Sequence, residues 1–179
     1  MKDRPFYLKF IQDVAFKQGK MAFICGPRQV GKTTLAQQLL SISADGHYYN
    51  WDDLEFKRAW IKNPKDLVPD TVGKKQTVVF DELHKAPRWK SILKGVYDLR
   101  QNVADIAVTG SAKLDTFRRG GESLFGRYYL LHMHPFSLGE LQGHSPDFES
   151  LLAKLNQKLE TAPADFEKLF RFGGFPEPL

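Results

Sequence analysis

The residues from Gly26 to Thr33 have the types and spacing of a loop that binds a chain of phosphates. They fit the pattern G-x-x-x-x-G-K-[ST] at every specified position. Glycines let such a loop curl until its N–H groups converge on phosphate oxygens, and the next helix turns its positive end to the anion. We expect Lys32 to reach the β- and γ-phosphates and Thr33 to bind Mg²⁺. The predicted binding set is Gly26, Pro27, Arg28, Gln29, Val30, Gly31, Lys32, Thr33 and Thr34.

Two adjacent carboxylates, Asp81 and Glu82, follow the apolar run at 78–80. We expect Asp81 to hold Mg²⁺ through water and Glu82 to orient the water that attacks the γ-phosphate. A carboxylate that orients water favours hydrolysis over transfer of the phosphoryl group to a substrate, because a small-molecule kinase uses its substrate's hydroxyl as nucleophile. An apolar run followed by Asp-Glu is common, so this prediction depends on the upstream loop.

A third polar group follows the apolar run at 106–109, where Gly110 precedes Ser111. Either Ser111 or Thr109 could hydrogen-bond the γ-phosphate or the attacking water. A serine at this place is equally typical of a helix N-cap, so both interpretations stay open.

Short apolar runs that alternate with helical periodicity must position these groups, and they predict an α/β fold with a mostly parallel sheet. In such a sheet the carboxyl ends of the strands share the edge where ligands bind. The expected strands are 20–25, 47–51, 76–80, 106–109 and 128–133. Helices are expected around 7–14, from Lys32, over 53–61 and after Pro87, with a loop at 63–75. Asp52 or Asp53 is a candidate cap of the helix over 53–61, and a contact with the site is the less favoured alternative.

The pattern changes between residues 135 and 146, which predicts an α/β core at 1–134 and a helical segment at 135–179. Apolar spacing predicts helices over 148–159 and around 166–170. The chain stops at GGFPEPL without an evident capping element, so we expect this helical segment to be an incomplete lid.

Composition excludes several classes of protein. The 179 residues are 42% hydrophobic and 26% charged, as in globular domains, and contain neither a signal peptide nor an apolar run that could span a membrane. The one cysteine, Cys25, excludes an internal disulfide and fits the cytoplasm. Two histidines, His132 and His134, make only a weak metal site. His84 follows the Asp-Glu pair and could reach the active site, but a surface contact is the favoured expectation.

The net charge of +5 permits an anionic partner. A basic group consists of Lys57, Arg58, Lys62, Lys65, Lys74 and Lys75. Such a group is usually a solvated face, and without a DNA-binding motif nucleic acid remains an unsupported alternative.

The order of these groups resembles the AAA+ ATPases. Six motifs, in their order along the chain, are similar to those of prokaryotic ATPases whose AAA domain precedes a C-terminal domain of unknown function. These motifs are GPRQVGKTTLA, NWDD, VVFDELHKAPRW, VTGSAKL, LFGRYYLLHMHPFSLGEL and FGGFPEP. The resemblance implies a three-layer fold whose five-stranded parallel sheet has the order 5-1-4-3-2. It also implies Mg²⁺-dependent ATP hydrolysis in the cytoplasm, with the C-terminal domain, absent here, and other copies of the chain as partners.

The resemblance also implies roles for individual residues. Lys32, Glu82 and Ser111 correspond to catalytic positions, and Arg127 to an arginine that touches the γ-phosphate in its own subunit or in a neighbour, with Arg118 and Arg119 as competitors. Pro176 corresponds to a proline that packs near the adenine. Two alternatives to an ATPase are a nucleotide-dependent switch with little turnover and, less favoured, a small-molecule kinase.

Overall fold

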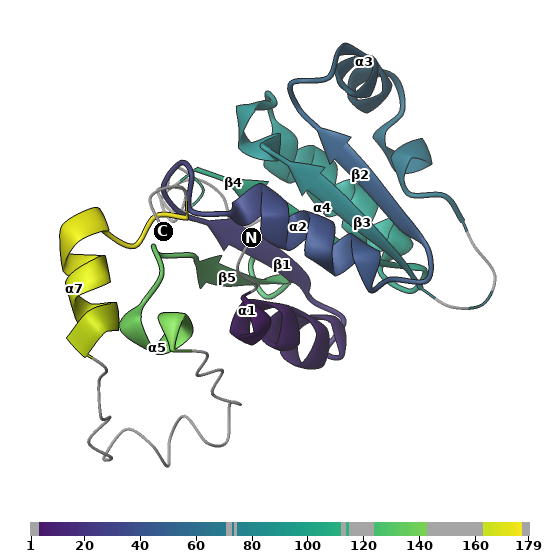
Figure 1. Cartoon of the computed structure of the whole chain (residues 1–179). Coiled ribbons are helices and arrows are strands. Elements are labelled where there is room, and N and C mark those ends of the chain that lie inside the picture. Colours follow the sequence, from purple (N-terminus) through teal and green to yellow (C-terminus); the bar gives the residue numbers. More distant parts are fainter. Residues whose placement is uncertain are drawn as a thin grey trace.

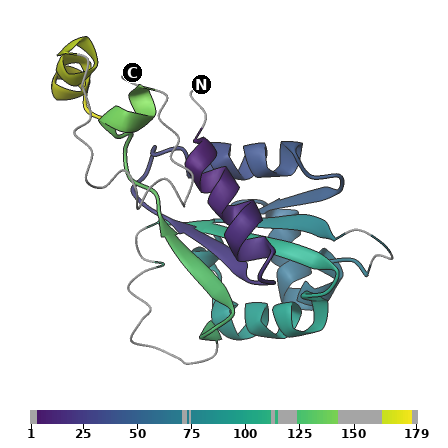
Figure 2. The same cartoon turned by 90° about the horizontal axis from the view of Figure 1, so that it is seen from below.

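In a computed structural model, the chain forms three layers, with a parallel sheet between helices (Figures 1 and 2). The structure describes residues 4–70, 73, 75–111, 114, 124–142 and 163–176. The five strands of the sheet are ordered β2-β3-β4-β1-β5. This is the predicted order 5-1-4-3-2 counted from the other edge, so the predicted fold is confirmed.

The register of the strands brings their carboxyl ends to one edge. Cys25, the last residue of β1, lies beside Gly110 and His132 on the neighbouring strands, and Asn50 lies beside Asp81. The strand bounds are β1 (Met21–Cys25), β2 (Gly46–Asn50), β3 (Gln76–Asp81), β4 (Ala104–Gly110) and β5 (Tyr128–His132). They differ from the predicted bounds by one or two residues.

The described helices are α1 (Pro5–Phe10), α2 (Lys32–Ser41), α3 (Leu54–Lys62), α4 (Trp89–Arg100), α5 (Leu138–Leu141) and α7 (Pro163–Phe172). A π-helix, η1 (Ile11–Phe16), continues α1, and the predicted loop after α3 contains a short 3-10 helix, η2 (Pro64–Leu67). As predicted, Asp53 caps α3, because its Oδ1 accepts the Glu55 N–H at 2.9 Å. The predicted helix over 148–159 lies outside the described residues.

The helix expected directly after Pro87 begins two residues later. A 3-10 turn, η3 (Leu83–Lys85), follows β3, and Arg88 adopts a left-handed conformation with φ of 52°. Left-handed backbone cannot continue into an α-helix, so α4 starts at Trp89.

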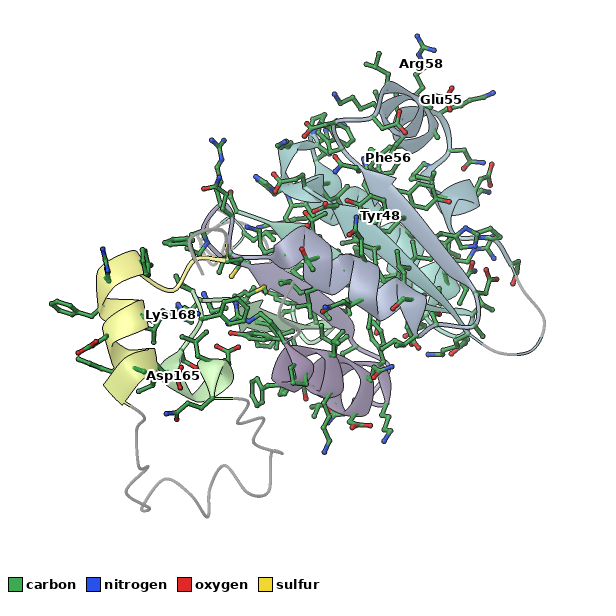
Figure 3. All side chains as sticks on the ribbon, in the orientation of Figure 1. Tyr48, Glu55, Phe56, Arg58, Asp165 and Lys168 are labelled. Atoms are coloured by element: carbon green, nitrogen blue, oxygen red, sulfur yellow. The ribbon has the colours of Figure 1, made fainter. Side chains whose placement is uncertain are left out.

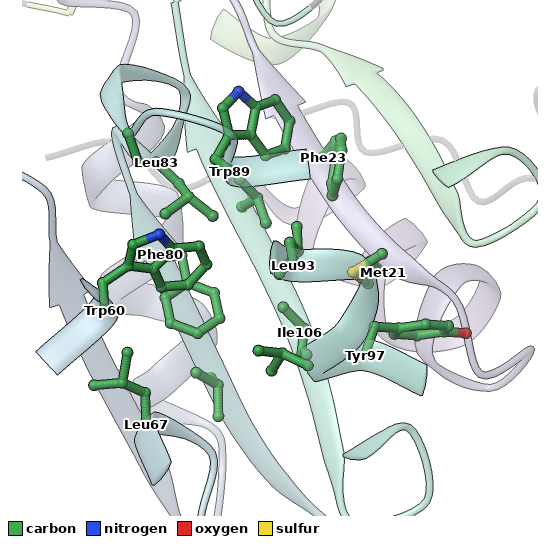
Figure 4. Packing of buried hydrophobic residues seen from close by; sticks show 14 of the residues in the cluster. Met21, Phe23, Trp60, Leu67, Phe80, Leu83, Trp89, Leu93, Tyr97 and Ile106 are labelled. Carbon is green, nitrogen blue, oxygen red and sulfur yellow. The ribbon is translucent and has the colours of Figure 1, made fainter. Parts of the chain in front are cut away.

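Each face of the sheet has its own apolar core. On one face, η1 and α2 pack on the sheet through Ile11, Leu35 and Leu39, and the partly buried Tyr7 of α1 packs against the same cluster. On the other face, α3 and α4 pack through Trp60 and Leu93, as Figure 4 shows for α4. The sheet is therefore buried on both sides, as parallel sheets require.

The segment that follows β5 is held to the core by Arg4. Its guanidinium makes two hydrogen bonds, of 2.8 and 2.9 Å, to the Glu140 carboxylate and one of 2.6 Å to the His134 carbonyl. Ser137 and Glu140 form a capping box on α5. Figure 3 shows Asp165 and Lys168 on α7, at the end of the molecule opposite to α3 with Arg58. None of the described helices is long and apolar enough to cross a membrane.

Candidate functional site

The loop between β1 and α2 is curled, as the positions of its glycines led us to expect. Gln29 and Gly31 both have left-handed backbone, with φ of 61° and 95°. A side chain at Gly26 would place its Cβ 2.2 Å from the carbonyl oxygen of Met133, so only glycine fits there. Pro27, Arg28 and Gln29 are exposed, which leaves the outer part of the loop open to a ligand.

Lys32, the first residue of α2, turns its ammonium group into this loop. Its Nζ donates hydrogen bonds to the carbonyls of Gly26 at 3.1 Å and Pro27 at 2.5 Å. Burial lowers the pKa of Lys32, and the nearby carboxylates of Glu82 and Asp81 oppose that shift. The structure thus brings the predicted lysine and both predicted acids together.

Asp81 is the centre of a hydrogen-bond network at the end of β3. Its buried carboxylate accepts a hydrogen bond from Thr33 Oγ1 at 3.0 Å, and further ones from Asn50 at 3.4 Å and from the hydroxyls of Tyr48 and Thr109. Oxygen atoms, such as those of carboxylates and hydroxyls, are the ligands that Mg²⁺ prefers. The pair Thr33 and Asp81 therefore fits the predicted magnesium ion.

Tyr48 and Asn50 were not predicted as part of the site. They lie on β2 two residues apart, which puts both side chains on one face of that strand next to Asp81. Burial, followed by the hydrogen bond to Asp81, raises the pKa of Tyr48 to about 12. The Tyr48 hydroxyl therefore stays protonated and donates at neutral pH.

Glu82 has left-handed backbone, with φ of 58°, so its side chain leaves the line of β3. Its N–H donates to Thr109 Oγ1 at 3.3 Å, and its carboxylate lies 3.5 Å from Lys85 Nζ. Lys85 also binds both carboxylate oxygens of Asp52, at 2.8 and 2.9 Å. Asp52 belongs to the NWDD motif, which is thereby connected to the site through Lys85.

Ser111 directly follows β4 and is half-buried, with its Oγ 3.1 Å from His84 Nε2. Thr109, the other predicted candidate at this strand end, is fully buried and uses its hydroxyl on Asp81 and Glu82. Only 10% of the His84 side chain is exposed, so the favoured expectation of a surface contact is wrong. The ring lies beside Ser111 and Glu82, in line with the alternative that His84 reaches the site.

Arg127 does not join the other predicted residues. It precedes β5, and its carbonyl accepts the N–H of Met21, the first residue of β1. A five-residue strand spans about 16 Å, so Arg127 lies at the edge opposite to the loop. Its guanidinium pairs with Asp98 at 2.7 Å. The prediction that Arg127 touches the γ-phosphate of its own subunit is therefore wrong, and a contact with the γ-phosphate of a neighbouring copy stays a prediction. The competing residues Arg118 and Arg119 lie outside the described residues.

A small cavity adjoins the loop on the side of the predicted adenine contact. Its lining residues are Arg4, Val30, Gly31, Thr34, Leu35, Gln38, Phe136 and Pro176. The predicted base contact Pro176 and the predicted binding residue Thr34 thus lie around one space, next to the loop.

No group of three or more metal-binding side chains exists among the described residues. The rings of His132 and His134 stack with centroids 6.3 Å apart, and Cys25 Sγ lies 3.3 Å from His132 Nδ1.

A family model described as an AAA domain matches residues 18–142. A search of curated proteins finds no significant match. Among solved structures, the chain is similar to AMPPCP-bound DnaA from Aquifex aeolicus (TM-score 0.61, 11% identity, 99% of this chain and 60% of that one). It is also similar to the Aeropyrum pernix ORC1 protein in complex with DNA (TM-score 0.57, 14% identity, 80% of this chain and 48% of that one).

A third similar structure is a signal transduction ATPase with numerous domains and a tetratricopeptide repeat sensor from Pyrococcus horikoshii (TM-score 0.57, 16% identity, 98% of this chain and 28% of that one). The chain spans less than two thirds of each of these neighbours. At identities this low, the structural similarity shows only a shared fold. The family model covers most of the sequence and therefore shows the family. The chain therefore belongs to the AAA domain family and has the fold of the AAA+ ATPases, which are nucleotide-binding, ATPase-type domains.

Proposed function

We propose that this chain binds ATP with Mg²⁺ and hydrolyses it to ADP and phosphate. The observation that supports this most strongly is the convergence of three groups at one sheet edge. The curled loop at 26–31, the Thr33–Asp81 pair and the Glu82 carboxylate meet there.

Each residue then has a distinct role. The loop amides and the Lys32 ammonium hold the phosphates and stabilise the charge that develops on them. Thr33 and Asp81 would hold the magnesium ion, which neutralises phosphate charge. Glu82 orients the attacking water and accepts its proton as the new P–O bond forms and the bond to ADP breaks. Ser111 hydrogen-bonds the γ-phosphate or the water.

We further propose that residues 1–134 are the nucleotide-binding core and that 135–179 are part of a helical lid. The Arg4–Glu140 ion pair supports a lid held close to the loop, since Arg4 also approaches the Val30 carbonyl at 3.4 Å. An arginine from a neighbouring copy could complete the site, in which case Arg127 is the candidate. The cytoplasm is the proposed location.

The proposed function is tested by release of inorganic phosphate from ATP, without any acceptor, in the wild-type chain and in Glu82→Gln. The variant should bind ATP as the wild type does and lose about 100-fold or more in turnover. Glu55→Gln makes the same change at the exposed start of α3 and should have no effect.

Three outcomes would contradict the proposal: equal turnover in wild type and Glu82→Gln, loss of ATP binding in that variant, or no phosphate release without an acceptor. Wild-type turnover far below about 1 s⁻¹ would instead favour a nucleotide-dependent switch.

A further inference from the structure

His84 lies between the two side chains that the proposed reaction places beside the attacking water. Its Nε2 is 3.1 Å from Ser111 Oγ, which is hydrogen-bond distance. Its Nδ1 is 3.8 Å from Glu82 Oε2, which is too long for a hydrogen bond and makes an ion pair only when the ring is protonated. One imidazole ring therefore spans from the end of β4 to the acid that follows β3.

Gly110, at the end of β4, leaves room for the His84 ring. A side chain at Gly110 would put its Cβ 2.7 Å from His84 Nδ1 and 2.6 Å from Leu114 Cδ1. The last residue of β4 must therefore be glycine for the imidazole to fit against that strand. His84 itself sits on η3, directly after the left-handed Glu82, so the same turn sets the direction of both side chains.

Glu82 has a second neighbour, Lys85, on the same turn. Lys85 connects Glu82 to Asp52 in the loop after β2, away from the end of β4. His84 is thus the described side chain that connects Glu82 to Ser111.

We propose that His84 is a positioning residue that holds the Glu82 carboxylate and the Ser111 hydroxyl in a fixed relation to each other. The inference rests on the proposed ATPase function and deepens it. Two polar groups that act on one water must keep their mutual spacing, because a misplacement of about 1 Å can cost 100-fold in rate. The ring fixes that spacing because it contacts both groups and is nearly buried.

The experiment compares phosphate release and ATP affinity in the wild type, His84→Ala and His84→Gln. We expect His84→Ala to lower kcat by roughly 10- to 100-fold, with ATP affinity within about 2-fold of wild type. Glutamine keeps a polar group that can reach Ser111, so His84→Gln should recover part of the lost turnover. His47→Ala is the matched control, because His47 lies on β2 toward the opposite sheet edge and should not change kcat.

The coupling between His84 and Ser111 gives a second test. Ser111→Ala deletes one oxygen from a half-buried side chain and leaves the packing of His84 in place. If the two act as a unit, the double variant with His84→Ala should lose no more turnover than the worse single variant. Losses that multiply would overturn the proposal.

Two results separate this inference from the proposed function. A wild-type chain that releases no phosphate refutes the ATPase and the positioning role together. A wild-type chain that turns over, with His84→Ala within 2-fold of it, refutes only the positioning role. Equal loss of kcat in His84→Ala and His84→Gln, or loss of ATP affinity in both, would also overturn it, since either result indicates a packing role.

Discussion

Replacing Thr109 by valine removes a hydroxyl that joins both acids of the site without changing the size of the side chain. Thr109 is fully buried, and its Oγ1 donates to Asp81 and accepts the N–H of Glu82 at 3.3 Å. A hydrogen bond to a charged group contributes about 1.5–3 kcal/mol, and the part-buried Glu82 N–H left without an acceptor costs about 1 kcal/mol, the low end of the range for a lost acceptor. Because the valine methyl group regains part of this, we expect Thr109→Val to lower the free energy of unfolding by about 3 kcal/mol.

The same substitution at Thr77 is the control. Thr77 is also buried, but its Oγ1 accepts a hydrogen bond from the neutral Ser43 hydroxyl at 2.9 Å, at the other end of β3. Loss of a neutral hydrogen bond should cost about 1 kcal/mol. Urea unfolding measures both variants, and the change should appear in the midpoint and not in the slope. If Thr109→Val costs no more than Thr77→Val, the network around Asp81 does not have the strength assigned to it.

Two further predictions concern the Arg4–Glu140 ion pair and the Tyr48 hydroxyl. Arg4→Ala leaves a buried ion pair broken and should cost about 3 kcal/mol in urea unfolding, whereas Lys17→Ala, which breaks an exposed pair, should cost less than about 0.5 kcal/mol; equal costs would contradict the role of Arg4. Folding raises the pKa of Tyr48 from 10.0 to about 12, so its protonated hydroxyl stabilises the fold fully below pH 10 and progressively less as the pH rises toward 12. The stability difference between wild type and Tyr48→Phe should therefore shrink over that window, and a constant difference would show that the Tyr48 hydroxyl is not held by the fold.

The central strands and the loop could be predicted because short-range patterns determine them. The stretches MAFIC at 21–25 and VVF at 78–80 are continuously apolar, as is typical of strands buried on both faces. The loop motif constrains backbone and side chains together. The order of the strands came from the family resemblance, because the apolar runs alone do not say which strands pair.

The prediction that Arg127 contacts the γ-phosphate of its own subunit was wrong for a simple physical reason. In a parallel sheet every residue that precedes a strand lies at the edge opposite to the carboxyl ends, and Arg127 directly precedes β5. The position of Arg127 before a strand thus indicates the opposite edge, whereas the family resemblance implies a contact with the γ-phosphate.

Other parts of the site could not be predicted from the sequence, because they depend on pairing between distant segments. Tyr48 reaches Asp81 only because β2 pairs with β3 in that register. His84 reaches Ser111 only because the turn after β3 lies against the end of β4. Neither contact has a spacing that marks it along the chain.

The most direct test of the account is a calorimetric titration of the intact chain with a non-hydrolysable ATP analogue, with and without Mg²⁺. We expect one binding site that Mg²⁺ strengthens, and a loss of roughly 10- to 100-fold in affinity for Lys32→Ala, as expected for losing a hydrogen bond from a charged group. Lys20→Ala, at the other end of β1, should bind as the wild type does. Absence of binding, or equal affinity in wild type and Lys32→Ala, would contradict the claim that the loop at 26–33 holds the phosphates.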